Sequence, residues 1–93
     1  VYAEVNWGMI ESWHPNPAPF YQVGAMWDVG VYPITLSTTI FGPVSSVTSV
    51  GTTLKPNRST REGVPFEVSK PDWAVSVLQF ASGPLMRLTT SFY

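Results

Sequence analysis

The sequence contains no cysteine and only one histidine, His14. The lack of cysteine excludes disulfide bonds and thiolate metal sites, and it is typical of a cytoplasmic protein. A single imidazole, with Glu11 and Asp28 as its only plausible carboxylate companions, gives little support to a metal site or a nucleophilic triad. We therefore predict no metal and expect His14 to be a structural residue or a partial ligand of a bound molecule.

Charge is also scarce. Charged residues make up 12% of the chain, the net charge is −1, and the five basic residues are scattered. This distribution gives no phosphate-binding patch and excludes nucleic acid as an expected partner. No Gly-x-Gly-x-x-Gly or Gly-x-x-x-x-Gly-Lys-Ser/Thr motif is present, so these residues lack a phosphate-cradling loop. No apolar run approaches the ~20 residues that span a membrane.

The size and composition indicate one small folded domain. The chain has 93 residues, of which 44% are hydrophobic and 14% aromatic, enough for a thin core but not for two domains. It opens at Val1 and closes at Tyr93 inside strand-like patterns, whereas natural domain ends tend to be polar and loose. We therefore expect residues 1–93 to be a single domain cut from a longer protein.

The stretch Phe20–Pro43 is the one segment with the length and freedom from turn signals to form a helix of about three turns. We predict a helix from Val23 or Gly24 to about Phe41. Its apolar face would contain Val29, Pro33, Leu36, Ile40 and Phe41, with Ser37, Thr38 and Thr39 largely on the other side. Pro33 would then remove a hydrogen bond to the carbonyl of Val29 and kink the helix.

Alternating or β-branched segments predict strands around this helix, at Val1–Trp7, Val44–Leu54, Asp72–Ala81 and Leu85–Phe92. Ser82-Gly83-Pro84 is a hairpin signal, and Gly51 indicates a bulge or a close backbone approach. Lys55–Pro71 reads as a long exposed connection in which Val64–Val68 adds a short edge strand.

This order of elements predicts an α+β fold, with an open, mainly antiparallel sheet and one main helix packed on one face. The opposite, Ser/Thr-rich face of the sheet would stay open, which suits a contact between copies in a homo-oligomer.

The loop Gly8–Pro19 carries prolines at 15, 17 and 19, which hold an extended and rigid path. Rigid loops that carry aromatic and polar tips often contact ligands. We therefore take as candidate substrate contacts His14, Asn16 and Tyr21. The alternative is that Trp13, Phe20 and Tyr21 close the core, and for Trp13 and Phe20 we prefer it.

Asp28 and Tyr32 stand four residues apart, so on one helix they would share a face. A carboxylate beside a phenol is a pair that acid/base chemistry can use. Alternatively, Asp28 caps a helix turn while Tyr32 packs its ring and donates its hydroxyl to a backbone carbonyl. The residues alone leave both interpretations open.

Three segments carry a resemblance to a known family: Trp13-His14-Pro15-Asn16-Pro17, Asp28-Val29-Gly30-Val31-Tyr32 and Ile40-Phe41-Gly42-Pro43-Val44. Together they resemble the C-terminal domain of the Gfo/Idh/MocA oxidoreductases, the family of glucose–fructose oxidoreductase and inositol dehydrogenase. That domain has a glycine-rich lead-in, then Asp-x-Gly-x-His or Asp-x-Gly-x-Tyr at a helix start, and a Gly-Pro exit into a strand. Here the lead-in is reduced to Gly24-Ala25, and Tyr32 replaces the commoner histidine.

The resemblance implies a two-domain NAD(P)-dependent dehydrogenase that acts on a CH–OH group of a sugar, inositol or related polyol. An N-terminal Rossmann domain, absent from residues 1–93, would bind most of the NAD or NADP, so this chain alone should be inactive. It further implies that Tyr32 is the catalytic acid/base, that Asp28 is its partner, and that the present domain binds substrate and mediates oligomerisation. The alternative is a non-catalytic module that binds a partner protein through the open sheet face.

Overall fold

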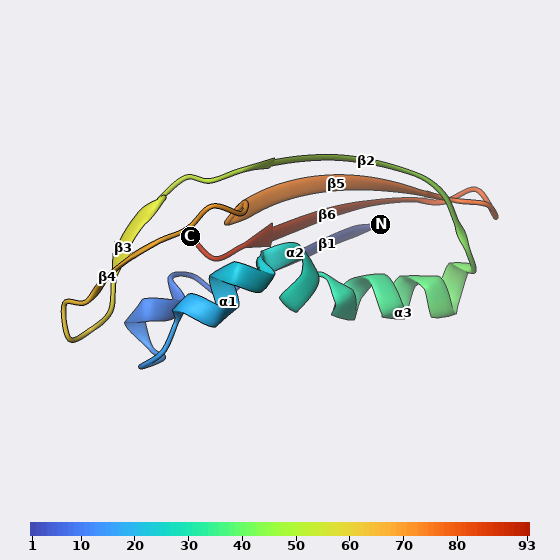
Figure 1. Cartoon of the computed structure of the whole chain (residues 1–93). Coiled ribbons are helices and arrows are strands. Elements are labelled where there is room, and N and C mark those ends of the chain that lie inside the picture. The colour runs from blue at the N-terminus through green and yellow to red at the C-terminus, as the bar shows by residue number, and fades with distance from the viewer.

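The computed structural model describes all residues 1–93, in which a layer of helices lies along one face of a sheet (Figure 1). The helical elements are η1 (Ile10–Ser12), α1 (Ala18–Val23), α2 (Ala25–Asp28) and α3 (Val31–Phe41). The strands are β1 (Tyr2–Asn6), β2 (Val44–Thr52), β3 (Asn57–Ser59), β4 (Pro65–Glu67), β5 (Trp73–Phe80) and β6 (Leu85–Ser91).

The main sheet has the strand order β1-β6-β5-β2, and β3 with β4 forms a separate two-stranded ribbon. β5 pairs antiparallel with β2 and β6, whereas β1 pairs parallel with β6. Gly83, with φ of 118°, makes the tight turn between β5 and β6, as the hairpin signal predicted. The predicted α+β fold with an open, mainly antiparallel sheet is confirmed.

The single long helix expected over residues 23–41 is wrong, because glycines divide this region. Gly24 has φ of 90°, which ends α1, and Gly30 precedes α3. α3 therefore begins at Val31, so that Pro33 lies in its first turn. Backbone N–H groups there have no partner inside the helix, so Pro33 removes no helical hydrogen bond and the predicted kink is also wrong.

The buried side of α3 also differs from the prediction. Ser37 is only 5% exposed, whereas Leu36 and Ile40 are each 64% exposed. Burial of Ser37 costs little because its hydroxyl donates to the carbonyl of Pro33 at 2.7 Å. The larger apolar side chains that do pack toward the sheet are the half-buried Ile34 and Phe41.

The core consists of two clusters along the length of the sheet. One contains Ile10, Tyr21, Ala25, Val29, Val68 and Phe92, and the other contains Leu78, Phe80, Met86 and Leu88. Burial alternates along β5, where Ala74, Ser76, Leu78 and Phe80 are buried, and along most of β6. Ser91, which the alternation places on the outer side, is nevertheless buried. Phe20 packs against the first cluster, as expected. Trp13 does not close the core but lies exposed, with its ring centroid 6.0 Å from that of Trp7.

The segment Lys55–Pro71 is not a simple exposed connection. β4 confirms the predicted short strand within Val64–Val68, but β3 pairs with it to form a ribbon, and Arg58 in β3 is only 4% exposed. Gly51 proves to be a close approach, because a Cβ there would lie 3.0 Å from Pro71. The irregular register in β2 lies instead between Val44 and Ser46.

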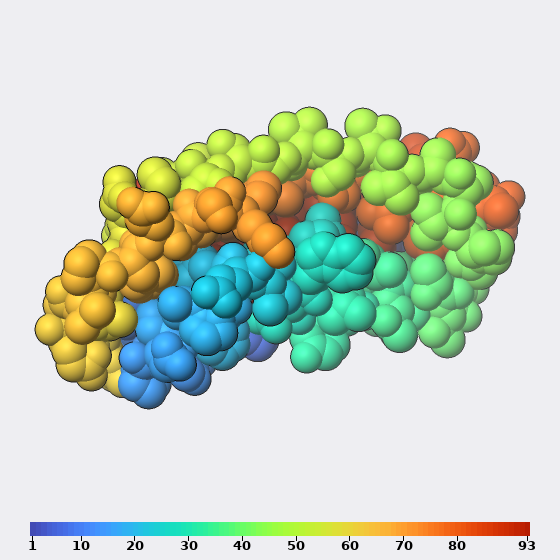
Figure 2. All heavy atoms as spheres, in the orientation of Figure 1, coloured from blue at the N-terminus to red at the C-terminus, as the bar shows by residue number.

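The helices do not cover the whole inner face of the sheet. All of β2 beyond Val44 is exposed, and a hollow separates this edge strand from the helix layer (Figure 2). The outer face is open as predicted, with Val50, Val77 and Leu85 exposed on it. No helix of the chain combines the length and apolarity that a membrane crossing requires.

Candidate functional site

Asp28 and Tyr32 flank a tight junction between two helices. Asp28 is the last residue of α2, and Tyr32 is the second residue of α3. Between them, Val29 is fully buried in the core, and a Cβ on Gly30 would lie 2.5 Å from the carbonyl oxygen of Met26. Because only glycine allows this approach, the Asp-x-Gly-x-Tyr spacing has a structural reason.

Both side chains at this junction have polar atoms without a hydrogen-bond partner in the chain. Asp28 is half-buried, and its Oδ2 atom is buried without a hydrogen-bond partner. The side chain of Tyr32 projects into solvent, the residue being 66% exposed. Neither of the structural roles considered for the pair is found, since Asp28 caps no helix and the Tyr32 hydroxyl donates to no backbone carbonyl. A buried carboxylate oxygen without a donor is costly, and such groups are concentrated at functional sites.

His14 and Asn16 lie in the proline-rich loop and interact with each other. Nδ1 of His14 accepts a hydrogen bond from the backbone N–H of Asn16 at 3.0 Å. The imidazole packs edge-on against Phe20, with ring centroids 4.9 Å apart, and against Trp13 at 5.7 Å. These contacts make His14 part of an aromatic surface cluster, and the structure shows no contact between this cluster and Tyr32.

Tyr21, the third expected substrate contact, is buried in the core. Its hydroxyl donates to Oε1 of Glu11 at 2.6 Å and accepts from the backbone N–H of Ile10 at 3.0 Å. It also accepts from Nη1 of Arg58 at 2.7 Å. The donor and both acceptor positions of this hydroxyl are thus filled within the chain.

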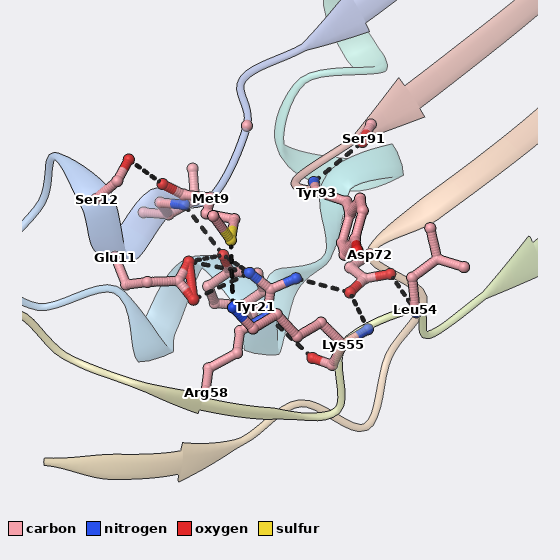
Figure 3. A network of polar contacts seen from close by, with 12 residues as sticks. Met9, Glu11, Ser12, Tyr21, Leu54, Lys55, Arg58, Asp72, Ser91 and Tyr93 are labelled. Atoms are coloured by element: carbon pink, nitrogen blue, oxygen red, sulfur yellow. Dashed lines mark hydrogen bonds and ion pairs between the residues drawn. The ribbon is translucent and has the colours of Figure 1, made fainter. Parts of the chain in front are cut away.

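Arg58 is the centre of the buried network that holds Tyr21 (Figure 3). Its Nη1 donates to both carboxylate oxygens of Glu11, at 2.9 and 3.0 Å. Its Nη2 donates to Asp72 at 2.8 Å, and its Nε donates to the carbonyl of Lys55 at 3.0 Å. Asp72 in turn accepts the backbone N–H groups of Leu54 and Lys55. The network therefore ties the β3–β4 ribbon to η1 and α1.

The ionisation of this network is set by burial and by its own hydrogen bonds. Desolvation would raise the pKa of Glu11, but the hydrogen bonds from Tyr21 and Arg58 outweigh it and lower this pKa. Burial, followed by the hydrogen bond to Glu11, raises the pKa of Tyr21 well above its usual range. Burial would lower the pKa of Arg58, but the hydrogen bonds to Asp72 and Glu11 raise it.

Sequence reasoning missed this network. Glu11 and Arg58 are 47 positions apart, so no local pattern relates them. The available signal was compositional: an arginine and two carboxylates in a chain with so little charge are candidates for a buried cluster. No three His, Asp or Glu side chains come together as a metal site would require.

A dinucleotide does not fit these residues alone. The sequence has no glycine-rich phosphate loop, and the cavities of the chain measure about 200 to 300 Å³. Sites for drug-sized ligands begin at about 300 Å³ and extend to about 1,000 Å³. Neither Asp28 nor Tyr32 lines any of these three cavities.

Comparison with models of known protein families shows which family this chain is related to. The model for the GFO/IDH/MocA C-terminal domain matches residues 1–93. The chain belongs to this family. The resemblance found in the three sequence segments is thereby confirmed.

Two solved structures have similar folds. An NAD binding oxidoreductase from Klebsiella pneumoniae gives a TM-score of 0.75 at 20% identity, over 98% of this chain and 26% of that protein. An oxidoreductase domain protein from Kribbella flavida gives a TM-score of 0.62 at 25% identity, over 72% of this chain and 18% of that protein. This GFO/IDH/MocA domain thus spans about a quarter or less of the proteins it matches. No curated protein sequence matches it.

Proposed function

We propose that this GFO/IDH/MocA domain forms the substrate half of an NAD(P)-dependent oxidoreductase acting on a CH–OH group of a sugar, inositol or related polyol. Tyr32 is its acid/base residue, and Asp28 binds and orients the substrate hydroxyl. The observation that carries the proposal is the buried, unpartnered Oδ2 of Asp28 beside an exposed phenol, across a junction that requires glycine. Membership of an oxidoreductase family supports it.

The roles follow from what each group can do. The half-buried carboxylate of Asp28 accepts a hydrogen bond from a substrate hydroxyl and so fixes its position. The phenolate form of Tyr32 accepts the proton that the hydroxyl loses on oxidation, and the phenol returns it on reduction. A lysine of the N-terminal domain, which the family resemblance implies, would complete the site. NAD or NADP, held mainly outside these residues, supplies the hydride acceptor.

The test is Tyr32→Phe in the full-length protein. This change removes only the hydroxyl that transfers the proton, so turnover should fall by ~10²-fold or more. Nucleotide affinity should stay unchanged because Tyr32 does not hold the nucleotide. Steady-state kinetics and a nucleotide titration measure the two effects.

Tyr93→Phe is the matched control, because it deletes another exposed phenol hydroxyl and should leave turnover unchanged. Wild-type turnover by Tyr32→Phe would contradict the assignment.

The second candidate is a non-catalytic module that binds a partner, or another copy of itself, through the outer sheet face. The exposed Val50, Val77 and Leu85 on that face favour it. The two functions differ in what else the protein contains. A Gly-x-Gly-x-x-Gly motif after a strand and a Glu-Lys-Pro-like lysine, both upstream of Val1, favour the enzyme.

A further inference from the structure

A cavity of about 300 Å³ lies where the α1–α2 junction, β2 and the start of β5 meet. It opens in the hollow of Figure 2, between the yellow-green edge strand, the teal helices and the orange residues near 70. The residues that define its chemistry are Gly24, Trp27, Ser49, Gly51, Lys70 and Pro71. The cavity lies at the lower end of the size range of small-molecule sites.

The wall formed by Lys70 and Pro71 is held in place by two glycines. On one side, a Cβ on Gly24 would lie 3.8 Å from Cβ of Lys70, and φ of 90° makes any side chain there strained. On the other side, Gly51 leaves just enough room for the ring of Pro71. Thr53 adds a hydrogen bond from its hydroxyl to the carbonyl of Lys70 at 3.2 Å. The backbone of Lys70 is therefore fixed between the helix layer and the edge strand.

Lys70 is the only ionisable residue that lines the cavity. Its ammonium group forms no ion pair within the chain. The two ion pairs of the chain join Arg58 to Glu11 and to Asp72. A cationic side chain in the lining of a cavity that holds no other ionisable residue favours a ligand that carries a negative charge.

Trp27 supplies a large apolar surface beside this cation. It is 79% exposed, the highest exposure among the large hydrophobic residues of the chain. It lines the cavity and also a second hollow of about 210 Å³ formed with Met26, Val31 and Ile34. An indole left in solvent offers a flat face on which a planar ring can stack.

We propose that this cavity binds a small aromatic carboxylic acid. Its carboxylate pairs with the ammonium group of Lys70, and its ring lies on the indole of Trp27. Ser49, whose hydroxyl lies 2.7 Å from that of Ser76, gives one polar contact on a wall that is otherwise apolar. The site uses other residues than Asp28 and Tyr32, so it does not depend on the proposed function.

The test is a calorimetric titration of the full-length protein with benzoate and with benzamide, two ligands of equal shape that differ in charge. The wild-type protein should bind benzoate about 5-fold more tightly, as expected for one exposed ion pair worth about 1 kcal/mol. Lys70→Met should remove this preference. Arg61→Met, which deletes an exposed cation between β3 and β4, should retain it.

Two further variants test whether the ligand ring binds at Trp27 and whether this cavity acts separately from Tyr32. Trp27→Ala should weaken both ligands by about 10-fold, because it removes the stacking surface. Tyr32→Phe should leave benzoate binding unchanged whatever it does to turnover. The proposal is overturned by equal wild-type affinities, by a preference that survives Lys70→Met, or by no binding of either ligand to protein whose circular dichroism shows it folded.

Discussion

Two pairs of a carboxylate and a phenol, Glu11 with Tyr21 and Asp28 with Tyr32, differ in almost every physical respect. Glu11 and Tyr21 form a hydrogen bond of 2.6 Å inside the core, and Arg58 binds both of them. Asp28 and Tyr32 flank a helix junction, where one carboxylate oxygen has no donor and the phenol is exposed. The same chemical groups are thus fully paired in one place and free in the other.

The difference supports the roles proposed for the two pairs. Burial and the hydrogen bond to Glu11 raise the pKa of Tyr21, so its hydroxyl stays protonated at any physiological pH. It serves as a fixed donor in the network. The hydroxyl of Tyr32 has no such partner and remains available to a substrate. Residue type alone does not distinguish the two pairs. Their surroundings support a structural role for Glu11 and Tyr21 and the proposed chemical role for Asp28 and Tyr32.

The largest effect on stability is expected from Arg58→Met, which leaves Glu11 and Asp72 buried without their cation. Removal of one partner of a buried ion pair costs ~3–5 kcal/mol, so local opening should accelerate amide exchange by more than ~100-fold. The amides of Leu54 and Lys55 are the reporters, because both donate to Asp72. Arg61→Met is the control and should change stability by less than ~0.5 kcal/mol. Unchanged exchange in Arg58→Met would show that the network does not hold the ribbon.

Acid should weaken the same region to a smaller extent. The pKa of Glu11 is lower in the folded chain than in the unfolded chain. Its contribution to stability is therefore present above the unfolded pKa of about 4.3 and is lost as the pH falls through the folded value. Unfolding midpoints in urea between pH 7 and pH 3 measure this loss. Glu11→Gln should show a weaker pH dependence than wild type below pH 5, and an identical dependence would refute the assignment.

The smallest effect on stability is expected at the open pair. Asp28→Asn keeps the shape of the side chain and removes a charge that has no protein partner at Oδ2. Because the buried, unpartnered charge is itself costly, the free energy of unfolding should stay the same or rise by about 1 kcal/mol. Turnover of the full-length enzyme should nevertheless fall by about 10-fold or more, because the substrate hydroxyl loses its acceptor. A large loss of stability with normal turnover would make Asp28 a structural residue like Glu11.

The strands were largely predictable because their signals are local. Alternation predicted strands over Asp72–Ala81 and Leu85–Phe92, where β5 and β6 lie, and Ser82-Gly83-Pro84 predicted the hairpin between them. The helices were less predictable, since the helix predicted over residues 23–41 included Gly24, which ends α1, and Gly30, which precedes α3. Leu36 and Ile40 were assigned to the core on hydrophobicity, although Ser37 faces the sheet.

The candidate site was predictable in its residues but not in its geometry. The Asp-x-Gly-x-Tyr motif named Asp28 and Tyr32, yet nothing in the sequence showed that Gly30 must pack on Met26. The Arg58 network and the Lys70 wall depend on contacts between distant segments. Tyr21 was expected at a ligand site because it follows a rigid aromatic loop, and only its three hydrogen-bond partners reveal its place in the core.

The parallel pairing of β1 with β6 has a consequence for how the domain folds. The amino group of Val1 donates to the carbonyl of Leu85, 84 positions away, and β1 has no other strand beside it in the sheet. Contacts of such large sequence separation are slow to form because a long loop must close first. During synthesis, β1 emerges earliest but stays without a neighbour until β6 is made. Closure of the sheet is therefore a late event, and the hairpin of β5 and β6 is the template on which it occurs.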